Sequence, residues 1–289
     1  MKLALGTAQF GFPYGIANKT GQVDLTEAKA MLALIKATGI DTLDTAIAYG
    51  KSEACLGEAG ICGFKVVTKL PSVPDECLDV NNWVLEQVSA SHARLCVTST
   101  YGLLLHDSHQ LIGVNGKAIY RALQSLKDLG LVHKIGVSIY APSELDAIAK
   151  RYRVDLVQAP FNLVDLRLYR SGWLQRLKDN EVEVHTRSVF LQGLLLMPPA
   201  VMPSKFAQWS PLWNRWNHWL TSNNLTAVQA CLAFPHAFPE IDRIVVGADN
   251  CRQLEQIINA AISLQTADMI DLHCDEENLI NPARWAALQ

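Results

Sequence analysis

The feature of this sequence that most constrains its fold is an alternation of short apolar segments with longer segments of helical spacing. The short segments indicate β-strands, which begin near Leu3, Thr42, Lys65, Gly102, Lys134, Val154, Val182 and Ile241. Because a helical pattern follows each strand, the strands are expected to be parallel, and eight such units predict a (β/α)8 TIM barrel. A doubly wound sheet is the alternative, but no G-x-G-x-x-G motif follows the first strand.

Length and composition agree with one large domain. The chain has 289 residues, of which 49% are hydrophobic and 18% charged, and no shift in composition marks a second domain. We therefore expect a single barrel domain over residues 1–289. Prolines and glycines predict a loop-rich insertion at about 194–216, and the tail at about 269–289 is weakly patterned.

Two helix starts are well marked. Asp24 precedes an apolar face of helical spacing and is followed three residues later by Glu27, as in a capping box. Asn250 is placed to cap the last strong helix, which follows the last strand.

Polar side chains occur where three successive strands end. Asp44 ends the strand that begins near Thr42, Lys69 follows the run 65–68, and His106 follows the run 102–105. Tyr49 lies in the turn after Asp44. In a (β/α)8 barrel all strands deliver their carboxyl ends to one face, so these four side chains are expected to converge there.

The chemistry of the four groups is complementary. A phenol ordinarily has a pKa of about 10, and a nearby ammonium group stabilises the phenolate. Lys69 can supply that charge, Asp44 can keep Lys69 charged and in place, and a neutral His106 can hydrogen-bond a carbonyl oxygen and orient it toward Tyr49. A carbonyl polarised in this way can accept a hydride.

Over nearly its whole length the chain resembles the aldo/keto reductases. The resemblance is carried by LDTAIAYGKSEACLG, VVTKL, LLLH, KIGVS, VDLVQAPFN, FLQGLL and IVVGADNCRQLEQI. It implies that Asp44, Tyr49, Lys69 and His106 form the catalytic tetrad, with Tyr49 as the proton donor. It also implies a reduced nicotinamide cofactor as the hydride source and an aldehyde or ketone as the substrate.

The resemblance also implies a set of cofactor-binding residues. Ser138, Gln158 and Asn162 match the positions that hold the nicotinamide carboxamide, and Arg187 stands where many relatives have an aromatic ring stacked on the nicotinamide. The phosphates would be met by two later segments, which contribute Gln192, Gly193, Gly247, Ala248, Asn250, Arg252 and Gln253. A helix that begins at Asn250 would add its free N–H groups and its dipole.

The last of these segments carries charges of both signs, which point to different nicotinamide dinucleotides. Arg252 is its one basic residue, where NADPH-specific relatives tend to have more, and Asp249 adds a negative charge. The expectation from sequence is a slight preference for NADP(H) over NAD(H).

Charge and cysteine content exclude several other functions. A net charge of −3 argues against nucleic acid or an anionic membrane as the main partner. The seven cysteines include no C-x-x-C pair, and the short apolar run after Met1 predicts neither a signal peptide nor a spanning helix, so a cytoplasmic protein is expected. No metal site is expected, because His106 and His109 lie in a turn and the first strand has no His-x-His.

Two other functions remain open at this level. Lys69 could attack a carbonyl to form a Schiff base, as in a lyase or aldolase, or the barrel could bind NADP(H) without catalysis, as a sensor or partner subunit. The carbonyl substrate and the oligomeric state are not determined by these patterns. The stripe of tryptophans that includes Trp209 and Trp213 is more typical of packing, but Trp209 or Trp213 could instead line the substrate pocket, with Pro198 to Trp209 as a lid.

Overall fold

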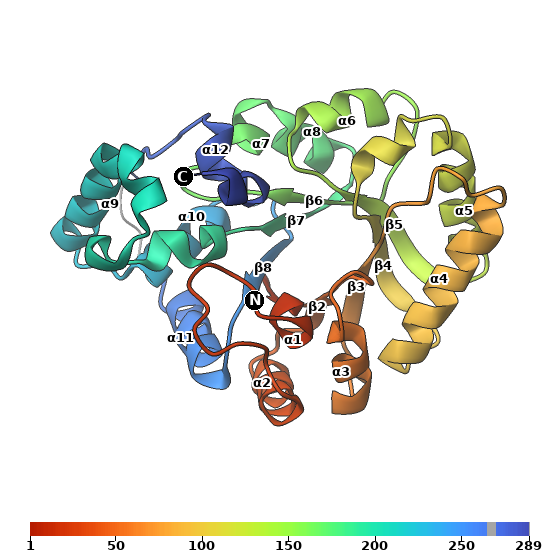
Figure 1. Ribbon diagram of the computed structural model, residues 1–289, viewed down its shortest axis with the longest axis horizontal. Coiled ribbons are helices and arrows are strands. Elements are labelled where there is room, and N and C mark those ends of the chain that lie inside the picture. Colours follow the sequence, from red (N-terminus) through yellow and green to blue (C-terminus); the bar gives the residue numbers. More distant parts are fainter. Residues whose placement is uncertain (265–269, 289) are drawn as a thin grey trace.

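The computed structural model describes residues 1–264 and 270–288 and contains a closed barrel of eight strands, each hydrogen-bonded in parallel to its sequence neighbours (Figure 1). The strands are β1 (Leu3–Gly6), β2 (Thr42–Asp44), β3 (Lys65–Leu70), β4 (Thr100–Leu105), β5 (Val132–Ser138), β6 (Leu156–Pro160), β7 (Glu183–Arg187) and β8 (Arg243–Gly247). Strand β8 pairs with β1, which closes the barrel. The predicted (β/α)8 fold is confirmed.

Helices surround the strands, and one group of them extends to one side of the barrel, on the left in Figure 1. The α-helices are α1 (Ala8–Gly11), α2 (Leu25–Ala37), α3 (Ser52–Ala59), α4 (Val80–Leu95), α5 (Gly116–Asp128), α6 (Ser143–Ile148), α7 (Arg167–Arg170), α8 (Trp173–Asp179), α9 (Ser210–Ser222), α10 (Ala227–His236), α11 (Cys251–Ile262) and α12 (Glu277–Ile280). Short 3₁₀ helices are η1 (Ser108–Leu111), η2 (Leu191–Leu196), η3 (Pro199–Val201), η4 (Ser204–Trp209) and η5 (Pro282–Ala287). Among the described residues, no helix is long and apolar enough to cross a membrane.

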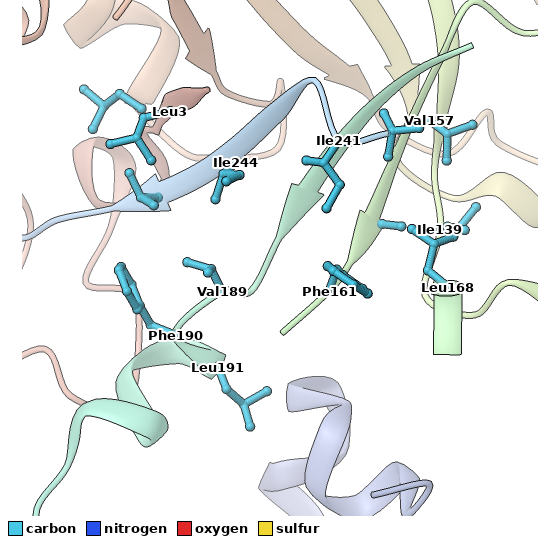
Figure 2. Packing of buried hydrophobic residues seen from close by; sticks show 14 of the residues in the cluster. Leu3, Ile139, Val157, Phe161, Leu168, Val189, Phe190, Leu191, Ile241 and Ile244 are labelled. Atoms are coloured by element: carbon cyan, nitrogen blue, oxygen red, sulfur yellow. The ribbon is translucent and has the colours of Figure 1, made fainter. Parts of the chain in front are cut away.

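Apolar side chains fill two separate spaces. The larger cluster lies between the strands and the surrounding helices, and Figure 2 shows the part of it formed by β6, β7, β8 and η2, including Val157, Ile244 and Leu191. A small cluster of Val67, Leu104 and Leu156 is separate from it. These three residues come from β3, β4 and β6, which are not all neighbours in the sheet, so they meet inside the barrel.

Both predicted helix starts are confirmed, but at the start of α2 the Glu27 side chain has a different partner from the one a capping box requires. Asp24 Oδ1 accepts from the backbone N–H of Glu27 at 2.9 Å, and Asn250 Oδ1 accepts from that of Gln253 at 2.9 Å. The carboxylate of Glu27 does not complete a capping box. It accepts instead from the backbone N–H of Cys251, so it joins the start of α2 to the start of α11.

The insertion and the tail contain more regular structure than the sequence patterns suggest. The expected loop at 194–216 includes η3, η4 and the start of α9, and residues 270–288 include α12 and η5. Residues 269 and 289 of the predicted tail lie outside the described residues. The two segments pack together, since the Phe206 and Trp285 rings lie 4.9 Å apart and Lys205 Nζ donates to the Trp285 carbonyl at 2.9 Å.

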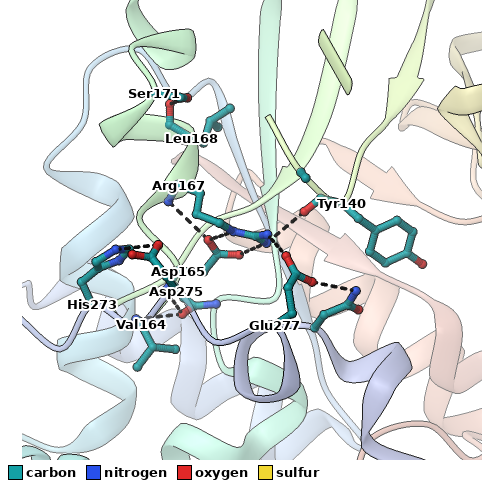
Figure 3. Close-up of polar contacts among 12 residues, drawn as sticks. Tyr140, Val164, Asp165, Arg167, Leu168, Ser171, His273, Asp275 and Glu277 are labelled. Atoms are coloured by element: carbon teal, nitrogen blue, oxygen red, sulfur yellow. Dashed lines mark hydrogen bonds and ion pairs between the residues drawn. The ribbon is translucent and has the colours of Figure 1, made fainter. Parts of the chain in front are cut away.

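A second contact joins the tail to the barrel through Arg167 (Figure 3). Its guanidinium donates to both carboxylate oxygens of Asp165 at 2.8 Å, to the carboxylate of Glu277 in α12, and to the backbone carbonyl of Tyr140 at 3.0 Å. Charge-assisted, two-pronged pairs of this kind hold geometry well. The C-terminal segment is thereby tied to the loop after β5.

We predict that Glu53 is required for stability, because its buried carboxylate joins three elements. It accepts from Thr68 and Ser91 at 2.7 Å and pairs with Arg94. Replacing Glu53 by Gln is expected to lower the free energy of unfolding in urea by roughly 2–3 kcal/mol. The matched change at exposed Glu58 in the same helix should cost less than about 0.5 kcal/mol. Equal stability of the two variants would contradict this assignment.

Candidate active site

A buried ion pair lies where β2 and β3 end. Lys69 is 1% exposed and Asp44 is 4% exposed, and Lys69 Nζ donates to both Asp44 carboxylate oxygens at 2.7 and 2.9 Å and to the Thr45 carbonyl at 2.9 Å. Burial opposes the charge on the ammonium group, but the carboxylate of Asp44 and the nearby phenol of Tyr49 outweigh it and hold the pKa of Lys69 above its usual value. Lys69 is therefore a fixed cation whose three N–H donors are all used.

Gln158 extends this pair across the barrel interior. Its Nε2 donates to Asp44 Oδ2 at 2.6 Å, although 114 residues separate the two in sequence. Its Oε1 is buried and has no partner among the described residues. Ser138, on the neighbouring strand and paired in register with Gln158, is also buried. A buried acceptor without a partner is costly unless a ligand supplies a donor.

Close packing positions the turn that carries Tyr49. Gly11 at the end of α1 lies against the Tyr49 backbone, and a Cβ built there would fall 1.8 Å from the Tyr49 carbonyl oxygen. Gly50 has a φ of +52°, which favours glycine. Lys69 Nζ lies 5.1 Å from the centre of the Tyr49 ring, and the His106 ring stands edge-on to it with centroids 5.8 Å apart. The phenol and the imidazole therefore face the same space, beside the ammonium group.

His106 is held in its neutral form. Burial, the charge of Lys69 and the charge of Arg187 together lower its pKa to about 4. A neutral imidazole carries one ring N–H and one acceptor nitrogen. Near pH 7 it can donate a hydrogen bond to a carbonyl oxygen without acting as an acid.

Arg187 places a second cation at the barrel mouth. Its Nη2 donates to the Ile139 carbonyl at 3.0 Å, its Nη1 donates to Ser188 Oγ at 3.3 Å, and its guanidinium lies 4.6 Å from the centre of the Tyr140 ring. These contacts orient the plane of the guanidinium beside a tyrosine. Tyr140 is in turn held by Arg167 through its backbone carbonyl.

One cavity of about 520 Å³ brings most of the predicted residues together. Those that line it are Asp44, Tyr49, Lys69, His106, Ser138, Gln158, Arg187, Gln192, Gly193, Gly247 and Gln253. Its volume falls in the usual range for a small-molecule site. In the described part of the chain, no group of three or more His, Cys, Asp or Glu side chains has an arrangement suited to a metal ion.

Four predicted residues do not line the cavity. The Asn162 side chain joins two loops, because its amide donates to the Ser188 carbonyl after β7 and accepts from the N–H groups of Val164 and Asp165 in its own loop. Ala248 is buried, Arg252 is exposed, and Asn250 is engaged in capping α11.

Trp209 and Trp213 also do not line this cavity, and none of the residues 198–209 does. Both indoles are buried in the large apolar cluster, and Trp213 Nε1 donates to the Phe206 carbonyl at 3.0 Å. Of the two roles that the sequence leaves open for these tryptophans, the structure supports packing.

The cavity has lining residues that the sequence patterns did not indicate, among them Gln9, Tyr14, Asn18 and Tyr140. Tyr140 follows Ser138 by two residues, so strand alternation could have indicated it. Tyr14 and Asn18 lie in the loop after α1, which has no periodicity to follow. That loop reaches the β7 side of the cavity, where Gln192 donates to the Tyr14 hydroxyl at 3.4 Å.

Comparison with known proteins agrees with this arrangement. The profile of the aldo/keto reductase family matches residues 2–273. This chain belongs to the aldo/keto reductase family. It is therefore an oxidoreductase of a family that uses nicotinamide cofactors and acts on small carbonyl compounds. It is 23% identical over 244 residues to the uncharacterized oxidoreductase YqkF of Bacillus subtilis, covering 77% of this chain and 78% of YqkF.

Two solved structures are similar in fold. The holo form of aldo-keto reductase AKR11C1 from Bacillus halodurans superimposes with a TM-score of 0.74 at 19% identity, covering 92% of this chain and 88% of that one. PA4992 from Pseudomonas aeruginosa gives a TM-score of 0.67 at 22% identity, covering 90% and 89%.

We predict that the charge of Arg187 can be detected through His106. Replacing Arg187 by Gln removes a positive charge that lowers the pKa of His106, so this pKa should rise by roughly half a unit or more. Titration of the ring signals by NMR would measure it. Arg176→Gln, at a residue that does not line the cavity, is the control and should leave the titration unchanged. An identical His106 titration in Arg187→Gln would contradict the prediction.

Proposed function

We propose that this member of the family is an NAD(P)H-dependent reductase that converts an aldehyde or a ketone to an alcohol, with Tyr49 as the proton donor. The observation that carries the proposal is the meeting of Tyr49, His106 and the buried Asp44–Lys69 pair in one cavity. Each has a role that carbonyl reduction requires.

The residues present fit a nicotinamide. The unpartnered Oε1 of Gln158 is a buried acceptor for a carboxamide N–H, and the Ser138 hydroxyl lies on the neighbouring strand. The guanidinium of Arg187 can stack on an aromatic ring. When bound, the reduced nicotinamide supplies the hydride. Asn162 is less available to bind the carboxamide, because its amide already bonds to the Ser188 carbonyl and to the Val164 N–H.

The chain's own groups account for the proton. Neutral His106 donates a hydrogen bond to the carbonyl oxygen and holds it near the Tyr49 hydroxyl. As negative charge develops on that oxygen, Tyr49 donates its proton, and the ammonium of Lys69 stabilises the phenolate that remains. Asp44 keeps Lys69 charged and in position, so it acts through Lys69 and not on the substrate.

Observations at Lys69 disfavour the Schiff-base alternative. A lysine must lose its proton to attack a carbonyl. The raised pKa of Lys69 and its three hydrogen bonds keep it as an ammonium ion at neutral pH. The non-catalytic alternative, a binding subunit, has no observation in its favour.

We expect purified protein to bind a reduced nicotinamide cofactor and to oxidise it in the presence of aldehydes or ketones. Cofactor fluorescence would follow binding, and loss of absorbance would follow turnover across a panel of carbonyl compounds. Failure of both NADH and NADPH to bind at millimolar concentration would remove the proposal.

We predict that Tyr49→Phe loses turnover but keeps cofactor binding. Removal of the proton donor should lower kcat by about 10²- to 10⁴-fold. The cofactor dissociation constant should change less than about twofold, because the ring that packs beside Lys69 is retained. Tyr152→Phe, at a tyrosine that does not line the cavity, is the matched control. Turnover that survives in Tyr49→Phe would show that Tyr49 is not the acid.

A further inference from the structure

The cations of the cavity are confined to one end. Its basic residues are Lys69 and Arg187, which stand at the carboxyl ends of β3 and β7 at the barrel mouth. From there the lining continues past Gly247 at the end of β8 to Gln253, Gln256 and Ile257 in α11, which lies outside the barrel. Among the described residues, the one charged side chain that lines this second part is Asp249.

Asp249 is held in place by its neighbours. Asn18 Nδ2 donates to its Oδ1 at 3.1 Å and Gln253 Nε2 to its Oδ2 at 3.3 Å, while its backbone N–H donates to Gln253 Oε1 at 2.9 Å. These neutral partners orient the carboxylate without neutralising it. Arg252 is three residues further along the chain, but its side chain is exposed and outside the lining.

A second carboxylate acts at the same helix end. Glu27 accepts from the backbone N–H of Cys251, and the Asn250 side chain accepts from that of Gln253. Two N–H groups of the first turn of α11 are therefore already used, one of them by an anion. This leaves the start of α11 less able to hold a further phosphate group than a free helix N-terminus would be.

The two nicotinamide dinucleotides differ at one position, the 2′ position of the adenosine ribose. NAD(H) has a hydroxyl there, which can donate to a carboxylate, and NADP(H) has a phosphate, which needs an arginine or lysine. If the nicotinamide lies beside Tyr49 and His106, the adenosine half extends along the same cavity toward α11. It then meets Asp249, and residues 1–264 and 270–288 place no lysine or arginine in this part of the lining.

We propose that this cavity selects NAD(H) over NADP(H), and that Asp249 determines the selection by accepting from the ribose hydroxyl and repelling a 2′-phosphate. The inference rests on the proposed function. It replaces the slight preference for NADP(H) expected from sequence. That expectation placed Arg252 in the site, whereas in the structure Asp249 lines the cavity and Arg252 does not.

The test is to measure the dissociation constants of NADH and NADPH by fluorescence titration, without substrate. For the wild-type protein we expect NADH to bind at least about tenfold more tightly than NADPH. Asp249→Asn removes the charge and retains the shape, so the ratio should fall by about tenfold, mainly through tighter NADPH binding. Asp249→Ser is the second variant, and thermal unfolding would verify that both are folded.

Two further variants separate the possible explanations. Glu255→Gln removes the same charge from an exposed position of α11 outside the lining, so it should leave the ratio unchanged. Arg252→Gln should also leave the ratio unchanged. NADPH binding that equals or exceeds NADH binding in the wild type, or a ratio unaffected by both Asp249 variants, would overturn the inference and leave the proposed function standing. Absence of binding by either cofactor removes both.

Discussion

The ion pair between Asp44 and Lys69 is the interaction on which the rest of the site depends. Two charges buried in a protein interior are costly unless geometry and additional hydrogen bonds compensate. Here the compensation is complete for the cation, whose three donors meet Asp44 and the Thr45 carbonyl, and Gln158 adds a donor to the carboxylate. The pair places a permanent positive charge beside the Tyr49 ring and against His106.

The charge of Lys69 acts on the neighbouring His106 at the barrel mouth. Burial, that charge and the charge of Arg187 lower the pKa of His106 and keep it neutral, so its imidazole can donate a hydrogen bond. Deeper in β7, His185 is buried and hydrogen-bonded to Glu183 at 2.7 Å, and Glu183 also accepts from Tyr101 and Lys134. The barrel therefore contains a second group of hydrogen-bonded ionisable side chains, on β4, β5 and β7, that the sequence patterns did not indicate.

The sequence predicts the barrel and the convergence of Asp44, Tyr49, Lys69 and His106 well, because both follow from periodicity and from strand ends. Asp44 is the last residue of β2, Lys69 is the last but one of β3, and His106 directly follows β4. A parallel barrel must bring such residues together. Strand alternation could also have placed Tyr140 and His185. The same reasoning fails where the chain is not periodic: it does not predict α1, the loop that brings Asn18 to Asp249, or the use of Glu27 at the start of α11. It also leaves the role of Trp209 and Trp213 undecided, because a stripe of aromatic residues looks alike whether it packs inward or faces a ligand.

We propose that the barrel mouth transfers a hydride from a nicotinamide to a carbonyl carbon. The most direct test is to supply the cofactor with deuterium at both C4 positions, together with an aldehyde or ketone that the enzyme turns over, and to analyse the alcohol by mass spectrometry. We expect one deuterium per product molecule, bound to the former carbonyl carbon. An alcohol that carries no deuterium at that carbon would contradict it.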